Sequence, residues 1–106
     1  MYSVKVTEPA ERDFNATVDY YRIVLKAPKA AHTLLDEIEE KLDFLSINPL
    51  IYDIENDEYL HERHIRSVLV KKHLIFYIVD QDTQQVLVLR ILYARRNWLG
   101  ILRGNE

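Results

Sequence analysis

Residues 65–98 decide the fold, and they read IRSVLVKKHLIFYIVDQDTQQVLVLRILYARRNW. Three runs rich in valine, isoleucine, leucine and aromatic residues are separated by two short polar links. The first run contains Ile65, Val68 and Val70, the second extends from Leu74 to Val79, and the third from Val86 to Tyr93. The first link is Lys71-Lys72, and the second extends from Asp80 to Gln84. β-branched and aromatic residues favour strands. Links this short join antiparallel neighbours, so the segment predicts a three-stranded meander.

The residues before this meander begin with a strand and a helix. Tyr2 to Thr7 alternates apolar and polar residues, which is typical of a half-buried strand. Thr7 is a favourable N-cap, and Pro9 costs little in the first turn of a helix, where its missing N–H would have no partner. Apolar residues then recur at helical spacing along Ala10 to Leu25. The pattern predicts an amphipathic helix.

A second helix is predicted after a break at Pro28, with an apolar stripe from Ala31 to Leu45. Asn48-Pro49 ends it, because a residue before proline is disfavoured in the helical region. The short link between the helices predicts an antiparallel hairpin. Residues 50–63 show no period and are predicted to form a loop. The expected fold is α+β in the order β-α-α-β-β-β, with a helical hairpin packed on a small, mostly antiparallel, curved sheet.

The bulk properties fit one domain spanning residues 1–106. The chain has 106 residues, of which 48% are hydrophobic, and a net charge of −3. It has no cysteine, no long apolar run and no leader-like N-terminus, so we expect a cytoplasmic protein without a membrane partner. Residues 1–62 contain 6 Lys/Arg and 14 Asp/Glu, whereas residues 63–106 contain 8 and 3. The basic second part suggests a surface for an anionic partner.

The sequence contains no clear motif for binding a metal or a cofactor. His61 and His64 are spaced to meet on one helix face, but no third ligand is obvious and the segment is predicted to be a loop. His32 is interpreted as a packing or surface residue. With Gly100 and Gly104 as the two glycines, a glycine-rich phosphate loop is excluded. We therefore predict neither a metal nor a cofactor.

A group of basic residues is set among aromatic residues in the second part of the chain. Its members are Arg66, Lys71, Lys72, His73, Arg90, Arg95, Arg96 and Arg103, with Tyr77, Tyr93 and Trp98. Arginine matches phosphate oxygens and aromatic rings stack on bases, so such a mixture on one sheet face can bind RNA or another anionic surface. Strand alternation predicts one core face and one wet face. By the same alternation Arg90 should oppose Ile91, and Lys71-Lys72 is interpreted as a solvated turn.

The order and spacing of these segments resemble the RelE/ParE superfamily of bacterial toxins. The similarity rests on Ile65–Val70, His73–Asp80 and Val88–Trp98, on the opening Val6–Phe14 and on the Asn48-Pro49 stop, and it covers nearly the whole chain. The resemblance implies a toxin of a type II toxin–antitoxin module. It also implies a cognate antitoxin that blocks the active surface, with operator DNA bound only through that antitoxin.

One branch of the superfamily consists of enzymes. RelE-like members cut mRNA in the ribosomal A site without a metal, by general acid and base chemistry. Their pattern assigns catalytic roles here to Arg66, His73, Tyr93 and Arg96. The chain departs from it in two places: Leu74 stands where an arginine is usual, and Leu102 falls near an expected tyrosine.

The other branch poisons DNA gyrase and is not enzymatic. ParE-like members tolerate the apolar run His73–Tyr77 and commonly end in a segment that Arg95–Trp98 resembles. An acidic chain also suits ribosome binding poorly, since RNA affinity comes largely from phosphate neutralisation. The sequence therefore favours a ParE-like gyrase poison, with Arg66, Arg95, Arg96 and Trp98 binding the target. The RelE-like endonuclease is the alternative, and an interaction module that has lost toxicity is a third.

Overall fold

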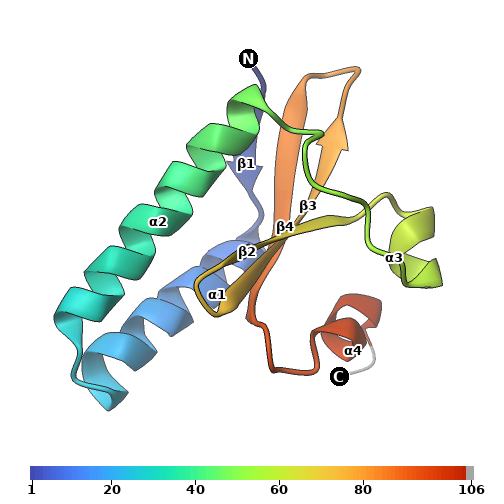
Figure 1. The fold of residues 1–106 in the computed structure, drawn as a ribbon. Coiled ribbons are helices and arrows are strands. Elements are labelled where there is room, and N and C mark those ends of the chain that lie inside the picture. The colour runs from blue at the N-terminus through green and yellow to red at the C-terminus, as the bar shows by residue number, and fades with distance from the viewer. Residues whose placement is uncertain (105–106) are drawn as a thin grey trace.

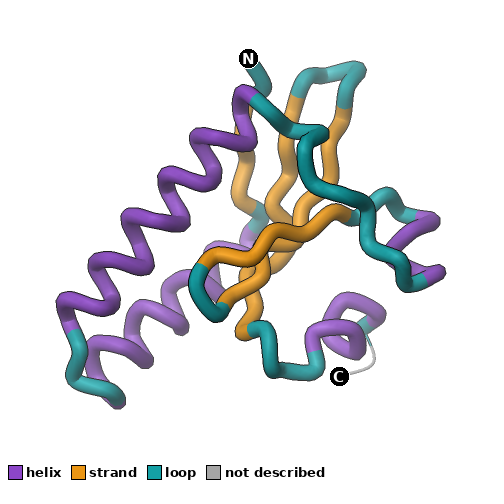
Figure 2. The backbone as a smooth tube through the Cα atoms, viewed as in Figure 1, coloured by secondary structure: helices purple, strands orange, loops and turns teal. Residues whose placement is uncertain are grey.

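The computed structural model describes residues 1–104 and confirms the predicted α+β architecture, with two additional short helices (Figures 1 and 2). The elements are β1 (Ser3–Val6), α1 (Glu8–Asp19), the π-helical turn η1 (Tyr20–Val24), α2 (Pro28–Ile47), α3 (Glu58–Glu62), β2 (Arg66–Val70), β3 (His73–Asp80), β4 (Gln85–Tyr93) and α4 (Trp98–Arg103). In the part of the chain that the structure describes, no helix has the length and apolar character needed to cross a membrane.

The four strands form one sheet in the order β1-β4-β3-β2. The first strand runs parallel to β4, whereas β2–β3 and β3–β4 are antiparallel, as predicted for a mostly antiparallel sheet. Arg66, the first residue of β2, lies opposite Tyr77 of β3, and His73, the first residue of β3, lies opposite Tyr93 of β4. The two pairs are therefore four residues apart along β3.

The helical hairpin covers one face of the sheet. Thr7 caps α1, as predicted, by accepting a hydrogen bond from the Ala10 N–H, and Pro9 lies in the first turn. The hairpin turns near Lys26, which has a φ of 50°. Figure 1 shows α1 and α2 side by side against the sheet. The buried core between them and the strands consists of Ala10, Leu34, Ile38, Leu45, Val68, Val70, Ile75, Tyr77, Val86, Val88 and Ile91.

The opposite face of the sheet is also covered, so the prediction of a wet face is wrong. The short helices α3 and α4 pack there around a second core of Leu60, Ile65, Phe76, Leu92 and Ile101. The prediction of a loop over residues 50–63 is likewise wrong in part, because α3 forms within this segment. Asp57 caps α3 by accepting a hydrogen bond from the Leu60 N–H (3.1 Å). A helix of one turn buries too few residues to leave a period in the sequence.

A β-bulge interrupts the alternation of β4. Phe76 lies opposite Arg90 and Tyr77 lies opposite Val88, so Leu89 is the extra residue. Because of this insertion, Val88 and Ile91 face the same core although they are three residues apart. Thr7 holds the bulge: its N–H donates to the Val88 carbonyl (3.0 Å), and its hydroxyl also donates there (2.8 Å).

Beyond Val6, helix α1 takes the place of β1 beside β4. The Asp13 carboxylate accepts two hydrogen bonds from the Arg90 guanidinium (2.6 and 2.9 Å) and one from the Ile91 N–H (3.1 Å). It thus supplies the backbone partner that a longer β1 would have supplied. The side chains are 11% and 26% exposed, which makes this a largely buried ion pair. This carboxylate therefore ties α1 to the sheet edge.

Replacing Asp13 with asparagine should lower the free energy of unfolding by about 1–3 kcal/mol, because Arg90 loses a charged partner in a partly buried position. Urea unfolding followed by circular dichroism measures the change. Asp19→Asn is the matched control, since Asp19 lies exposed on the same helix and should leave the stability unchanged. Equal effects of the two substitutions would refute the role given to Asp13.

Candidate functional site

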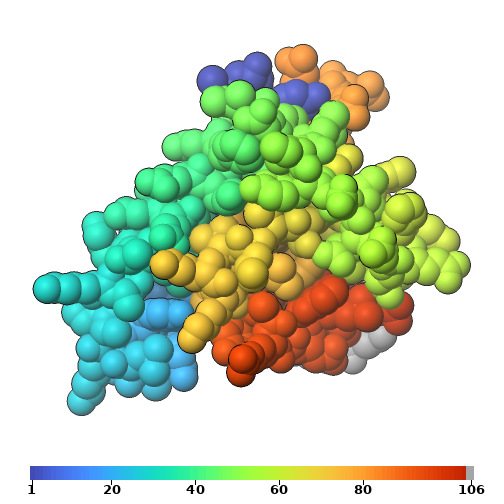
Figure 3. Space-filling view, viewed as in Figure 1, coloured from blue at the N-terminus to red at the C-terminus, as the bar shows by residue number. Residues whose placement is uncertain are grey.

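A cavity of about 620 Å³ lies between the tip of the helical hairpin and the end of the sheet that carries His73. In Figure 3 the β2–β3 turn, in yellow, lies between the blue tip of the hairpin and the red C-terminal segment. Three segments line the cavity: the hairpin, the β2–β3 turn, and β4 with the turn that follows. The lining residues are Asp13, Ala16, Thr17, Tyr20, Tyr21, Leu25, Lys72, His73, Ile91, Leu92, Tyr93 and Arg96.

His73 is the buried polar residue of this cavity, with 5% of its surface exposed. Its ring centroid lies 6.2 Å from that of Tyr21 and 5.7 Å from that of Tyr93. Its Nδ1 is buried without a hydrogen-bond partner among residues 1–104. Burial lowers the pKa of His73 below its ordinary value of 6.5, so the imidazole is neutral at pH 7.

The rim of the cavity carries Lys72, Tyr93 and Arg96, and backbone hydrogen bonds fix their segments. Lys72 follows Lys71, whose φ of 54° makes the tight turn between β2 and β3. The Lys72 carbonyl accepts from the Ala94 N–H (2.8 Å), and the Tyr93 carbonyl accepts from the Arg96 N–H (3.0 Å). The turn after β4 is therefore tied to the β2–β3 turn. Three of the four residues expected for a nuclease, His73, Tyr93 and Arg96, line this one cavity.

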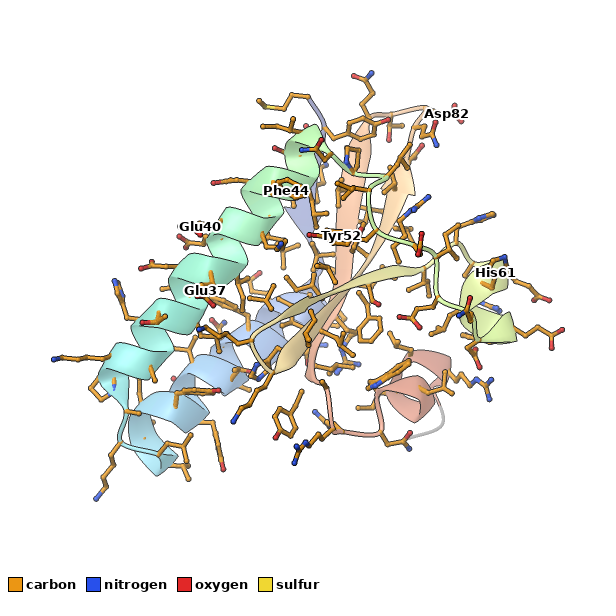
Figure 4. The ribbon with its side chains drawn as sticks, in the orientation of Figure 1. Glu37, Glu40, Phe44, Tyr52, His61 and Asp82 are labelled. Atoms are coloured by element: carbon orange, nitrogen blue, oxygen red, sulfur yellow. The ribbon has the colours of Figure 1, made fainter. Side chains whose placement is uncertain are left out.

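Arg66 lies elsewhere. Its guanidinium donates to the backbone carbonyls of Leu50 (3.4 Å) and Tyr52, which hold it against the segment after α2. Figure 4 shows Tyr52 between α2 and the strands. Because Arg66 pairs with Tyr77, four residues along β3 from His73, the two sites are about 13 Å apart along the strand. The structure does not bring Arg66 into the cavity.

Trp98 and Arg95 differ in their surroundings. Trp98 begins α4, and its ring stacks against Phe76 at a centroid distance of 5.2 Å, within the second core. Asn97 caps the helix by accepting from the Gly100 N–H (3.2 Å). Arg95, by contrast, is exposed in the turn after β4. The C-terminal segment therefore combines a packed tryptophan with an exposed arginine.

The predicted basic and aromatic group does not form one surface. Arg90 pairs with Asp13, Arg103 with Asp57 and Lys71 with Glu37 (3.4 Å). Tyr77 is fully buried, and burial raises its pKa to about 12, although the charge of Arg66 acts in the opposite direction. A tyrosine in that position cannot stack on a base. The alternation of the strands gave no sign of these partners, because Asp13 lies on α1, Glu37 on α2 and Asp57 at the N-cap of α3.

Sequence reasoning missed the wall of the cavity that the hairpin provides. Tyr20, Tyr21 and Leu25 belong to η1 or follow it, and they line the cavity opposite His73. The sequence places Tyr21 and Leu25 in the apolar stripe, which predicts burial against the sheet. The adjacent pair of tyrosines at the end of a helix was the available signal.

Trp98→Ala should lower the free energy of unfolding by about 2–4 kcal/mol, because the substitution removes an aromatic ring packed on Phe76. Arg95→Ala, three residues away and exposed, should change it little. Chemical denaturation of the two variants gives the comparison. An unchanged stability of Trp98→Ala would mean that the tryptophan is free to contact a partner instead of packing in the core.

Acid should destabilise the protein through His73. The folded state has the lower pKa, so below about pH 6.5 the unfolded state binds the proton more readily, and stability falls as the pH falls. About one pH unit above that value the imidazole is neutral in both states and contributes no slope. His73→Phe should remove this part of the slope in denaturation curves measured from pH 7.5 to 5. His32→Gln, at an exposed site on α2, should retain it; equal slopes for the two variants would exclude His73 as the cause.

Comparison with known proteins identifies the family. Residues 4–98 match the family model described as "ParE toxin of type II toxin-antitoxin system, parDE". Comparison with curated proteins gave no match.

Two solved structures have a similar fold. A chain of the chromosomal ParDE toxin–antitoxin system from P. aeruginosa has 22% identity and a TM-score of 0.69, with 90% of this chain and 98% of that chain covered. A chain of the RelBE2 toxin–antitoxin complex from Mycobacterium tuberculosis has 20% identity and a TM-score of 0.61, with 87% and 96% covered. Since the family model spans residues 4–98, the chain belongs to the ParE toxin family of type II toxin–antitoxin systems.

Proposed function

We propose that the chain arrests growth as a ParE-like toxin by poisoning DNA gyrase, without catalysing a reaction of its own. Its family supports this reading, because residues 4–98 match a ParE toxin model. A cognate antitoxin neutralises the toxin, and the likeness to chains of the ParDE system and the RelBE2 complex supports such a partner. Operator DNA is bound through the antitoxin, not by the toxin alone.

The observation that carries the proposal is the separation of Arg66 from His73. General acid and base catalysis requires groups within hydrogen-bond reach of the same reacting atoms. Arg66 binds the carbonyls of Leu50 and Tyr52, about 13 Å along the strand from the cavity that holds His73. This arrangement does not assemble the four residues of the RelE-like pattern around one phosphate.

The environment of the cavity supports the same reading. Burial keeps His73 neutral at pH 7, so it adds no positive charge for an RNA phosphate. Leu74 and Leu102, at the positions where the nuclease pattern has an arginine and a tyrosine, pack against the second core. Both positions therefore serve packing and supply no titratable group.

Arg95 and Arg96 are the side chains that we assign to target binding. Both are exposed in the turn after β4, whose backbone is fixed to the Lys72 carbonyl through the Ala94 N–H. Trp98 contributes by anchoring this turn to Phe76. Arg66 contributes by bracing the segment after α2. The target contact is thus an arginine pair held on a rigid support.

The RelE-like endonuclease remains the second candidate, because His73, Tyr93 and Arg96 do line one cavity. A phosphate bound at its rim would lie near Arg96, and a tyrosine hydroxyl would be available for proton transfer. The likeness to a chain of the RelBE2 complex concerns the fold and does not choose between the two activities.

Purified protein should inhibit supercoiling by gyrase and trap cleaved DNA, which agarose gels of plasmid DNA measure directly. Charge reversal at Arg95 or Arg96 should weaken growth arrest more than Lys29→Glu, an exposed control on α2, because only the arginines belong to the proposed contact. Primer extension on translated mRNA after induction tests the second candidate. Intact gyrase activity at excess protein, together with cuts in the A site, would replace the first proposal with the second.

A further inference from the structure

We propose that the cavity beside His73 binds a carboxylate carried on an apolar segment of a partner protein. The unpartnered imidazole, the cationic rim and the exposed apolar tip of the hairpin together define this ligand class. The inference holds whether the toxin acts on gyrase or on the ribosome, since it concerns what fills the cavity. A binding measurement on the isolated protein can therefore fail without affecting the proposed target.

His73 has a buried ring nitrogen without a hydrogen-bond partner among the described residues. Buried polar atoms in proteins almost always have hydrogen-bond partners, and each exception calls for an explanation. The Nδ1 of His73 has no partner within residues 1–104, although the residue is 95% buried and lines the cavity. A ligand that carries a carboxylate would supply an acceptor for an N–H at Nδ1 of the neutral imidazole.

The charges around the cavity favour an anionic ligand. The ionisable lysine, arginine and aspartate side chains that line it are Lys72, Arg96 and Asp13. Asp13 already binds Arg90 through two hydrogen bonds, which neutralises it. Lys72 adds positive charge at the rim. An anionic group entering there meets favourable potential, whereas an ammonium group would be repelled.

An apolar surface continues from the cavity over the hairpin tip. Tyr20, Ile23, Val24 and Leu25 are 51%, 68%, 62% and 49% exposed. Large apolar side chains gathered in this way mark interaction surfaces. Tyr20 and Leu25 belong both to this surface and to the wall of the cavity. A free carboxylate would leave Ile23 and Val24 uncovered, whereas an apolar protein segment with one acidic residue would cover both.

The cavity fits RNA less well. A nucleic acid strand draws its affinity from several phosphate contacts, and its bases stack on exposed rings. Two cationic residues line this cavity, and Tyr21 is directed toward the buried ring of His73. We therefore assign the cavity to a protein segment and treat RNA binding as a result that would overturn the assignment.

The test uses the complete chain and nuclear magnetic resonance of labelled protein. The probe is phenylpropionate, with the uncharged phenylpropanol and the cationic phenylpropylamine as controls. Phenylpropionate should shift the resonances of His73, Tyr21 and Tyr93 at millimolar concentration, and the two controls should bind more weakly. Lys72→Ala and Arg96→Ala should each weaken binding about two- to fivefold. Their neighbours provide matched controls, because Lys71→Ala and Arg95→Ala change residues that do not line the cavity.

Two further measurements make the result decisive. Bound phenylpropionate should raise the pKa of His73, which a titration of its ring protons measures. The other titratable or charged groups near the ring are Tyr21, Tyr93, Lys72, Arg96 and Asp13, which is paired with Arg90. A short peptide with one glutamate among leucines should bind about tenfold more tightly than phenylpropionate, because it also covers the hairpin tip. Its glutamine analogue should lose most of this affinity.

Four outcomes would overturn the proposal. One is the absence of shifts at His73 with both the peptide and phenylpropionate. Another is equal affinity for the glutamate and glutamine peptides, which would remove the carboxylate from the site. The third is stronger binding of a short oligouridylate than of the peptide at the same residues, which would assign the cavity to RNA. Equal affinity of peptide and phenylpropionate would overturn the assignment to a protein segment.

Discussion

The Asp13 carboxylate is the contact on which the rest of the structure depends. Strand β1 is short and ends beside the bulge of β4, so the backbone of β4 needs another partner from there on. Asp13 meets this need at Ile91 and neutralises Arg90 at the same point. Because the carboxylate belongs to α1, the helix is fixed at an angle that carries η1 over the end of β3. The cavity exists because that helix continues past the sheet.

Much of the fold could be predicted because it rests on local periods and caps. The meander, the hairpin and the Thr7 cap follow from spacing and residue type alone. The bulge could not be predicted, since a single inserted residue leaves the composition of β4 unchanged while it brings Val88 and Ile91 to one face. The last helix, α4, could have been predicted from the sequence. Asn97 is a good N-cap, Ile101 and Leu102 follow at helical spacing, and Gly104 ends the helix with a φ of 77°.

The site could be predicted only in part, because its residues come from segments that are distant in sequence. Family resemblance pointed to His73, Tyr93 and Arg96, and these line one cavity. It also pointed to Arg66, whose position beside Tyr77, four residues along β3 from His73, follows from the register of two strands. The role of Trp98 in the second core depends on Phe76, which lies 22 positions earlier and on a different element. Pairings of this kind are set by tertiary packing.

The topology also determines when the molecule can form during translation. Thr7 binds Val88 across 81 positions, and β1 has β4 as its neighbour in the sheet. At ordinary elongation rates the first strand waits roughly 4–16 s on the ribosome before that partner has been synthesised. The wall of the cavity from Ile91 to Arg96 emerges later still. A nascent chain therefore has no assembled site until residues as far as Arg96 have been synthesised.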